Sequence, residues 1–148
     1  MMPYNFLVES SPAMTDIAVL IIRIFIGVCF IVHALGKLGI VGPGNMAGFE
    51  GWLKSLGIPF PALQARMAMA CEMGGGILIT IGLFTRVGAA LCLVTMVVAG
   101  LIGHKGGGYL ITNTPPGNEY TINLAAILAA LMLLGPGTYS LDGFLFLP

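Results

Sequence analysis

Four stretches of apolar residues, each near the length that crosses a bilayer, dominate the pattern of hydrophobic and polar positions along this chain. A helix needs roughly 17 to 25 residues to cross a hydrocarbon core of about 30 Å, because its backbone polar groups must be satisfied within the segment. The predicted spans cover residues 17–38, 66–84, 87–103 and 120–135. The last ends at Gly135-Pro136-Gly137, which cannot continue a helix. This pattern predicts an all-α membrane protein, an antiparallel bundle of four transmembrane helices in a single domain of residues 1–148.

The first long connection carries a shorter, amphipathic pattern. Its apolar residues recur at helical spacing, at Phe49, Trp52, Leu53 and Leu56. Asn45 is a suitable N-cap and Gly57 a suitable stop. We therefore expect a short amphipathic helix that lies in the bilayer interface or caps the bundle. The second connection, residues 104–117, is rich in glycine and turn residues, a composition that fits a small hairpin or a flexible lid equally well.

Composition supports the membrane assignment and removes several classes of function. The chain has 57% hydrophobic and 8% charged residues, whereas soluble domains carry about 25% charged residues. Its net charge of zero gives no basic field for nucleic acid. The three cysteines form no CxxC pair and no cluster with histidine, so we expect no metal site, and their odd number rules out complete disulfide pairing.

Alternating helices would gather the two long connections at one end of the bundle, which we call face B. Both chain termini and a two-residue link at 85–86 would lie at the other end, face A. The run that follows residue 16 is too long for a signal-peptide core, so we expect a retained helix. Face B holds most of the basic residues near the predicted membrane, namely Lys37, Lys54, Arg66 and Lys105. The positive-inside rule then places face B in the cytoplasm and the termini on the non-cytoplasmic side.

Ionisable residues inside the predicted spans are the candidates for function, because each costs several kcal/mol in hydrocarbon unless it is paired or hydrated. At 1.5 Å per residue, Arg23 lies about 9 Å inside face A, whereas His33 and Glu72 lie about 8 and 9 Å from face B. Depth therefore matches Glu72 with His33, and more loosely with Lys37. Glu119 and Asn123 begin the last span at the same end.

These residues predict a polar pocket at face B, with Arg23 pointing into the bundle toward Glu72, Asp16 or Asp142. Three interpretations remain open. The charges could only hold a polar core together, they could bind a lipid-soluble molecule with a polar head, such as a quinone, or they could line a proton or solute pathway. No Ser/His/Asp set supports hydrolysis, and the single histidine within a span does not favour haem.

Several segments, in this order and spacing, resemble the DoxX family of small bacterial membrane proteins. They are Arg23-Ile24-Phe25-Ile26-Gly27, Phe30, His33-Ala34, Lys37, Leu56-Gly57-Ile58-Pro59, Glu72-Met73-Gly74-Gly75, Gly82-Leu83-Phe84-Thr85-Arg86, Gly117-Asn118-Glu119, Gly135-Pro136-Gly137 and Ser140-Leu141-Asp142. The family's usual His-Gly pair reads His33-Ala34 here. The resemblance implies a four-helix protein, often of unassigned activity, with relatives linked to thiosulfate:quinone oxidoreduction or to complexes that handle oxidative stress. Its recurring polar positions correspond to Arg23, His33, Lys37, Glu72 and Glu119.

We therefore expect a DoxX-like protein of the bacterial inner membrane, surrounded by lipid, that serves as a redox-associated subunit. It would bind a quinone-like molecule or a redox partner protein near face B, and it could form a homo-oligomer. Two alternatives belong to other classes of function. They are a structural or assembly subunit without catalysis, and a small-solute or proton pathway, for which inverted repeats or broken helices would be expected.

Overall fold

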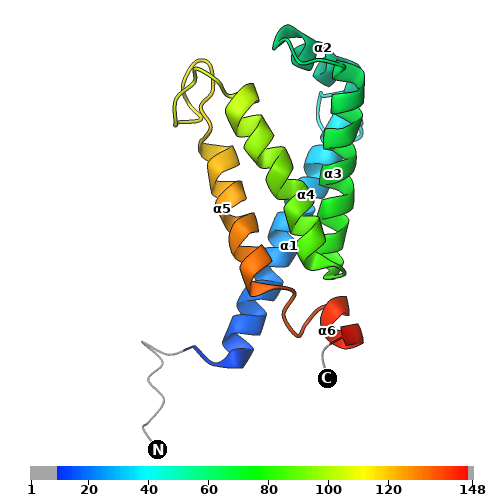
Figure 1. Ribbon diagram of the computed structural model, residues 1–148, viewed down its shortest axis with the longest axis vertical. Helices are drawn as coiled ribbons and strands as arrows, with labels where there is room; N and C mark the ends of the chain where they lie inside the picture. The colour runs from blue at the N-terminus through cyan, green and yellow to red at the C-terminus, as the bar shows by residue number, and fades with distance from the viewer. Residues whose placement is uncertain (1–9, 147–148) are drawn as a thin grey trace, which may run out of the picture.

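The computed structural model describes residues 10–146, a range that contains helices, turns and loops and no strand. The helices are α1 (Pro12–Lys37), α2 (Met46–Ser55), α3 (Pro61–Ile81), α4 (Thr85–Val98), the π-helical turn η1 (Ala99–Gly103), α5 (Glu119–Leu134) and α6 (Leu141–Phe146) (Figure 1). Each of the four predicted spans corresponds to a helix, and the amphipathic segment forms α2. The all-α class is confirmed.

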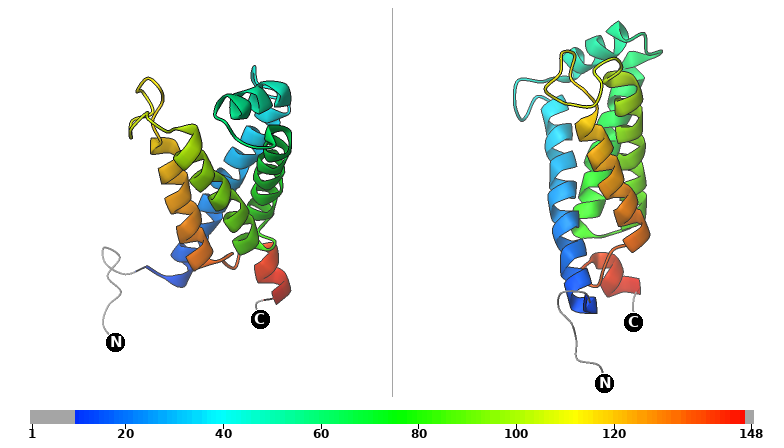
Figure 2. Two further views of the ribbon diagram at one scale, coloured as in Figure 1. Left: turned by 45° about the horizontal axis from the view of Figure 1, so that its top comes forward. Right: turned by 90° about the vertical axis from the view of Figure 1, so that its left-hand side faces the viewer.

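The four long helices lie side by side and alternate in direction. α1 packs along α3, α3 against α4 and α4 against α5, whereas α1 and α5 meet over a smaller area. The start of α1 and the short α6 lie at face A, and α2 and the loop of residues 104–118 lie at face B (Figure 2). The smaller contact between α1 and α5 makes their shared side the least closed part of the assembly.

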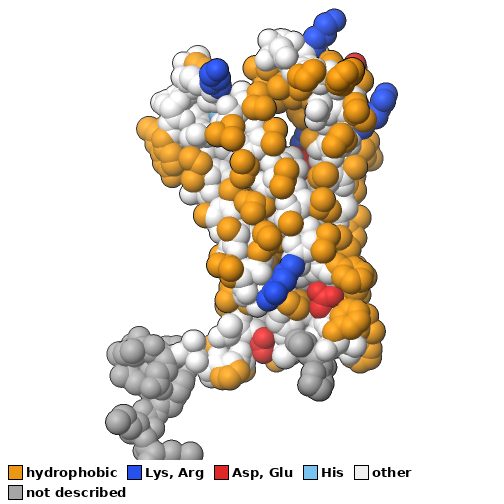
Figure 3. All heavy atoms as spheres, viewed as in Figure 1, with side chains coloured by type: hydrophobic (Ala, Val, Ile, Leu, Met, Phe, Trp, Pro, Cys, Tyr) orange, Lys and Arg blue, Asp and Glu red, His pale blue; other side chains and the backbone are white. Residues whose placement is uncertain are grey.

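The outer surface of the long helices suits lipid better than water. α1 and the segment Thr85–Gly103 are each long and apolar enough to cross a membrane. Large apolar side chains project outward from several helices, with Phe25 72% and Leu133 83% exposed. Apolar side chains cover much of the body seen in Figure 3, and the Lys and Arg side chains in that view lie toward its two ends. Such a surface would aggregate in water.

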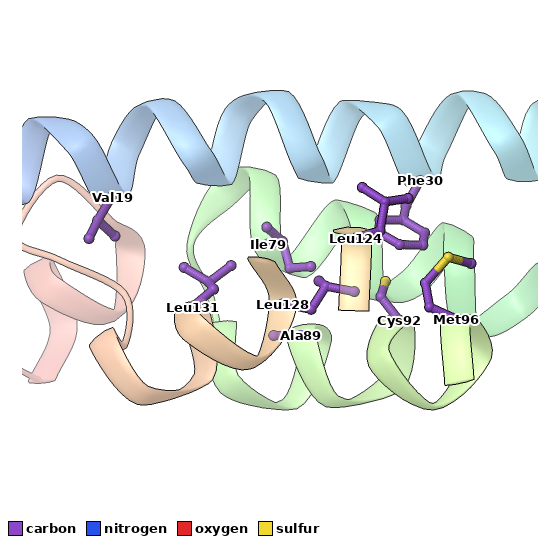
Figure 4. Close-up of a cluster of buried hydrophobic side chains, with 9 residues drawn as sticks. All are labelled: Val19, Phe30, Ile79, Ala89, Cys92, Met96, Leu124, Leu128 and Leu131. Atoms are coloured by element: carbon purple, nitrogen blue, oxygen red, sulfur yellow. The ribbon is translucent and has the colours of Figure 1, made fainter. Parts of the chain in front are cut away.

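The core follows from large apolar side chains and from glycines that let helices approach. Phe30, Ile79, Leu128 and Leu131 are fully buried within one cluster (Figure 4). A Cβ added at Gly76 would lie 2.8 Å from the carbonyl oxygen of Gly27 on α1, which is too close. Helices in membranes pack tightly through small residues of this kind. Gly27 and Gly76 therefore let α1 and α3 come into direct backbone contact at this point.

Two helices begin five residues before their predicted spans. α1 begins at Pro12, where the Ser11 hydroxyl accepts a hydrogen bond from the Met14 amide at 3.3 Å. α3 begins at Pro61, five residues before the predicted span. Proline suits the first helical position, because its missing N–H would have no partner there. Hydropathy marks where a helix is apolar, whereas caps and prolines decide where it begins.

The link between α3 and α4 is also shifted from its prediction. It comprises residues 82–84, whereas Thr85 and Arg86, predicted as the turn, belong to α4. Gly82 ends α3 in a left-handed conformation with φ +72°. The Asp142 carboxylate, in α6, then accepts hydrogen bonds from the amides of Phe84 and Thr85 at 2.8 and 3.0 Å. A cap from 57 residues away along the chain thus fixes the start of α4.

Candidate functional site

A buried ion pair joins the last turn of α1 to the middle of α3. Glu72 is only 3% exposed, and its carboxylate pairs with the Lys37 ammonium. Lys37 also lies over the ring of Phe49 on α2, 5.0 Å from the ring centroid. A carboxylate at this depth requires a partner, because an unpaired buried charge is strongly unfavourable. Depth in the membrane favoured His33 as the partner of Glu72. In the structure the long side chain of Lys37 reaches back by one helical turn and pairs with Glu72 instead.

A second polar pair joins α1 to the start of α5. The Tyr120 hydroxyl is hydrogen-bonded to Nε2 of His33, one turn before Lys37 on α1. The same hydroxyl lies 3.4 Å from the Cys29 sulfur. Tyr120 was not among the predicted site residues. A tyrosine within a predicted span could have been singled out, because a buried tyrosine hydroxyl usually needs a hydrogen-bond partner. His33 and Lys37, one turn apart on α1, thus bring Tyr120 and Glu72 to the same end of this helix.

A pocket of about 520 Å³ opens beside these pairs. It lies between the C-terminal half of α1, the turn that follows it and α2, and is lined by Val32, His33, Gly36, Lys37, Val41, Pro43, Gly44, Asn45, Gly48 and Phe49. Its size falls within the range of small-molecule sites, about 300 to 1,000 Å³. Lys37 and His33 thus face a mainly apolar space at face B. Glu72 lies behind them and holds the ammonium.

The other predicted residues lie elsewhere or have a different role. Arg23, 2% exposed, lies near face A and donates hydrogen bonds to four backbone carbonyl oxygens. Glu119 accepts a hydrogen bond from the Ile111 amide at 3.2 Å and so ties down the loop before α5. Asn123 is exposed and does not line the pocket. The structure therefore brings together His33, Lys37 and Glu72.

The loop of residues 104–118 contains no regular element and is held by backbone and side-chain hydrogen bonds, among them one from the Gly117 amide to the Leu110 carbonyl oxygen at 3.0 Å. The Asn113 amide donates to the Gly107 carbonyl oxygen at 2.8 Å, and a His104 ring nitrogen lies 3.1 Å from the Pro116 carbonyl oxygen. Of the two forms that the sequence left open, a small hairpin or a flexible lid, the loop comes closer to the first, because backbone hydrogen bonds join its two arms, although no strand forms among these described residues. Nearby, the ring of Trp52 on α2 packs so closely on η1 that a Cβ at Gly103 would lie 2.7 Å from it. This contact joins the pocket's helix α2 to the end of α4.

Comparison with known proteins places the chain in a family. The sequence profile of the DoxX family matches residues 18–105, which is more than half of the chain. The chain belongs to the DoxX family. This DoxX protein is 31% identical to "Inner membrane protein YphA" of Escherichia coli K12 over 138 residues, covering 88% of this chain and 91% of the relative. No solved structure matches it.

Two further relatives have a similar extent. "Putative oxidoreductase CatD" of Bacillus subtilis 168 is 31% identical over 132 residues, covering 88% of this chain and 89% of the relative. "Inner membrane protein YqjF" of E. coli K12 is 26% identical over 130 residues, covering 88% and 93%. The family match includes His33, Lys37 and Glu72, and it ends before Tyr120. The protein is thus a DoxX-family membrane protein whose relatives include named inner membrane proteins.

Proposed function

We propose that this protein is a redox-associated subunit of a bacterial inner membrane that binds a quinone-like molecule in the face B pocket. The observation that carries the proposal is the placement of Lys37 and His33 on the wall of a mainly apolar pocket, with Glu72 buried behind them. A quinone combines an apolar ring with carbonyl oxygens that accept hydrogen bonds. The pocket offers a matching surface for each part.

The chemistry of the lining divides into two parts. Val32, Val41 and Phe49 supply apolar contact for a ring. The Lys37 ammonium and the His33 ring nitrogen not bound to Tyr120 supply polar groups for carbonyl oxygens. An imidazole near the membrane interface can also exchange protons with such a ligand. The oxidoreductase name of one relative fits a redox role.

The proposal includes a topology. α1, α3, α4 with η1, and α5 would all cross the membrane, with face B in the cytoplasm and α2 in the interface. At 16 residues, α5 spans about 24 Å as a helix, so it would cross with help from its flanking turns. A redox partner protein would then dock at face B beside the pocket, where α2 and the loop of residues 104–118 lie.

A structural or assembly role is the second candidate, and the buried Lys37–Glu72 pair favours it as well. Buried polar pairs can fix how helices are positioned relative to each other without any ligand. In that role, removing either charge would lower the stability or the assembly of the protein. Ligand affinity measured on folded protein separates the two functions.

Trp52 makes the test direct, because it is the single tryptophan of the chain and stacks on Phe49, a pocket residue, at a centroid distance of 5.9 Å. Decylubiquinone added to the protein in lipid nanodiscs should quench Trp52 fluorescence saturably. Glu72→Gln and His33→Ala should each weaken this affinity about tenfold, which corresponds to about 1.4 kcal/mol.

The matched control is Glu50→Gln on α2, whose carboxylate makes no ion pair among residues 10–146. It should bind like the wild type. Circular dichroism and gel filtration would establish that each variant is folded. Unchanged affinity in both folded site variants would refute the proposed function, and unchanged affinity with reduced stability would favour the structural role.

A further inference from the structure

The polar side chains that line the face B pocket present mainly hydrogen-bond donors, and the one side-chain oxygen among them already accepts a hydrogen bond. An ammonium has three N–H groups, and Lys37 uses its contact with Glu72 for one of them. The Asn45 side-chain oxygen already accepts a hydrogen bond from the Gly48 amide at 2.8 Å, which leaves its NH₂ group. His33 is the third polar lining side chain of the ten lining residues, all of which the structure describes. Which role His33 takes toward the pocket depends on Tyr120.

The hydrogen bond to Tyr120 favours one tautomer of His33. The Tyr120 hydroxyl has one proton and two neighbours, Nε2 of His33 and the sulfur of Cys29. Donation from the hydroxyl to Nε2 is favoured over donation to the Cys29 sulfur, because a thiol sulfur is a weak acceptor and an unprotonated imidazole nitrogen is a good one. The Cys29 thiol in turn donates weakly to the hydroxyl oxygen.

With Nε2 as the acceptor, the neutral His33 ring carries its proton on Nδ1. Nδ1 has no other partner among residues 10–146, so its N–H is available to a ligand. The pocket therefore offers donors from His33, Lys37 and Asn45.

We propose that the pocket selects the oxidised, carbonyl-bearing form of its quinone-like ligand over the hydroquinone, and that Tyr120 sets this preference by holding His33 as an Nδ1–H donor. The inference rests on the proposed function. A quinone oxygen only accepts hydrogen bonds, and it meets a donor at each polar position. A hydroquinone must also place its two O–H groups, and the one side-chain oxygen in the lining, that of Asn45, already accepts a hydrogen bond.

The expected preference follows from the cost of one misdirected hydrogen bond. A typical hydrogen bond contributes about 1 kcal/mol net, which corresponds to about fivefold in affinity. The wild type should therefore bind decylubiquinone at least about fivefold more tightly than decylubiquinol. Tyr120→Phe removes the hydroxyl and frees Nε2 and Nδ1 to exchange the proton, so the preference should fall below twofold.

Anaerobic isothermal titration calorimetry in nanodiscs measures both affinities. Tyr139→Phe is the matched control, because it makes the same change near face A, where the hydroxyl has no hydrogen bond among the described residues. Cys29→Ala is a second control that should keep the preference, since it leaves the hydrogen bond between Tyr120 and His33 in place. Nitrogen-15 shifts of the imidazole rings should report an Nδ1–H tautomer for His33 that is lost in Tyr120→Phe. The chain has only two histidines, so His104→Gln assigns the signals.

The outcomes separate this inference from the proposed function. Equal affinity of the wild type for both forms, or a preference that survives Tyr120→Phe in a folded protein, would overturn the inference and leave quinone binding intact. Saturable binding of neither form would overturn the proposed function and the inference with it. A preference of at least fivefold that only Tyr120→Phe removes, together with the tautomer change, would support it.

Discussion

Replacing Arg23 with methionine tests the role that the structure gives to this buried charge. Its guanidinium donates to the carbonyl oxygens of Ile79 and Thr80 at the end of α3, at 3.0 and 3.2 Å, and to those of Pro136 and Tyr139, both at 2.8 Å. Hydrogen bonds to charged groups contribute about 1.5–3 kcal/mol each, so four give about 6–12 kcal/mol at most. Burying the guanidinium costs several kcal/mol of that sum. We expect Arg23→Met to lower the free energy of unfolding by about 3–5 kcal/mol.

Arg23→Lys should recover only part of this loss, because an ammonium offers its donors from one point and lacks the planar fork that reaches both segments. The free energy of unfolding would be measured by titrating the protein in dodecylmaltoside with dodecyl sulfate. Hydrogen exchange should also rise at residues 136–146. A loss below about 1 kcal/mol, or unchanged exchange there, would refute the reasoning. Folded Arg23→Met should keep its decylubiquinone affinity within about twofold, because Arg23 lies near the end opposite the pocket.

Two further predictions concern single polar contacts. Lys37→Met should cost about 3–5 kcal/mol because it leaves the Glu72 carboxylate buried and unpaired, whereas the double change Lys37→Met with Glu72→Met should restore most of that loss. Additive effects in this double-mutant cycle, measured by the same unfolding titration, would contradict the ion pair. Asp142→Ala should lower stability by about 1–2 kcal/mol, since two amides at the start of α4 lose their cap. Thermal melting followed by circular dichroism measures this, and a melting temperature equal to that of the wild type would show that the cap contributes nothing.

The helices were largely predictable from the sequence, because apolar runs and capping residues act locally. Asn45 caps α2 through a contact only three residues along the chain, and Gly135 ends α5 where predicted. α6 was not predicted, since six residues carry too little periodicity to mark a helix. The start of α4 was misplaced because its cap comes from Asp142, a distant residue that no local pattern connects to it.

The candidate site was predictable in its location but not in its pairing. Counting residues along helices placed His33, Lys37 and Glu72 near one end, as the structure shows. Depth counting follows backbone positions, so it ranked His33 ahead of Lys37 as the partner of Glu72, whereas the flexible lysine stem reaches back toward the bundle. Tyr120 escaped prediction because it lies 87 residues from His33 in the sequence. Its hydrogen bond crosses between α1 and α5, which share a smaller contact than the other neighbouring long helices.

The central claim is that the face B pocket holds a quinone-like molecule, and native mass spectrometry of the protein extracted from bacterial membranes in mild detergent tests it most directly. The wild type and Glu50→Gln should retain an added mass that matches a membrane quinone, identified by releasing it and reading its absorption spectrum. Glu72→Gln and His33→Ala should lose that mass while remaining folded. A wild-type protein that retains only phospholipid, or site variants that keep the quinone as fully as the wild type, would contradict the account.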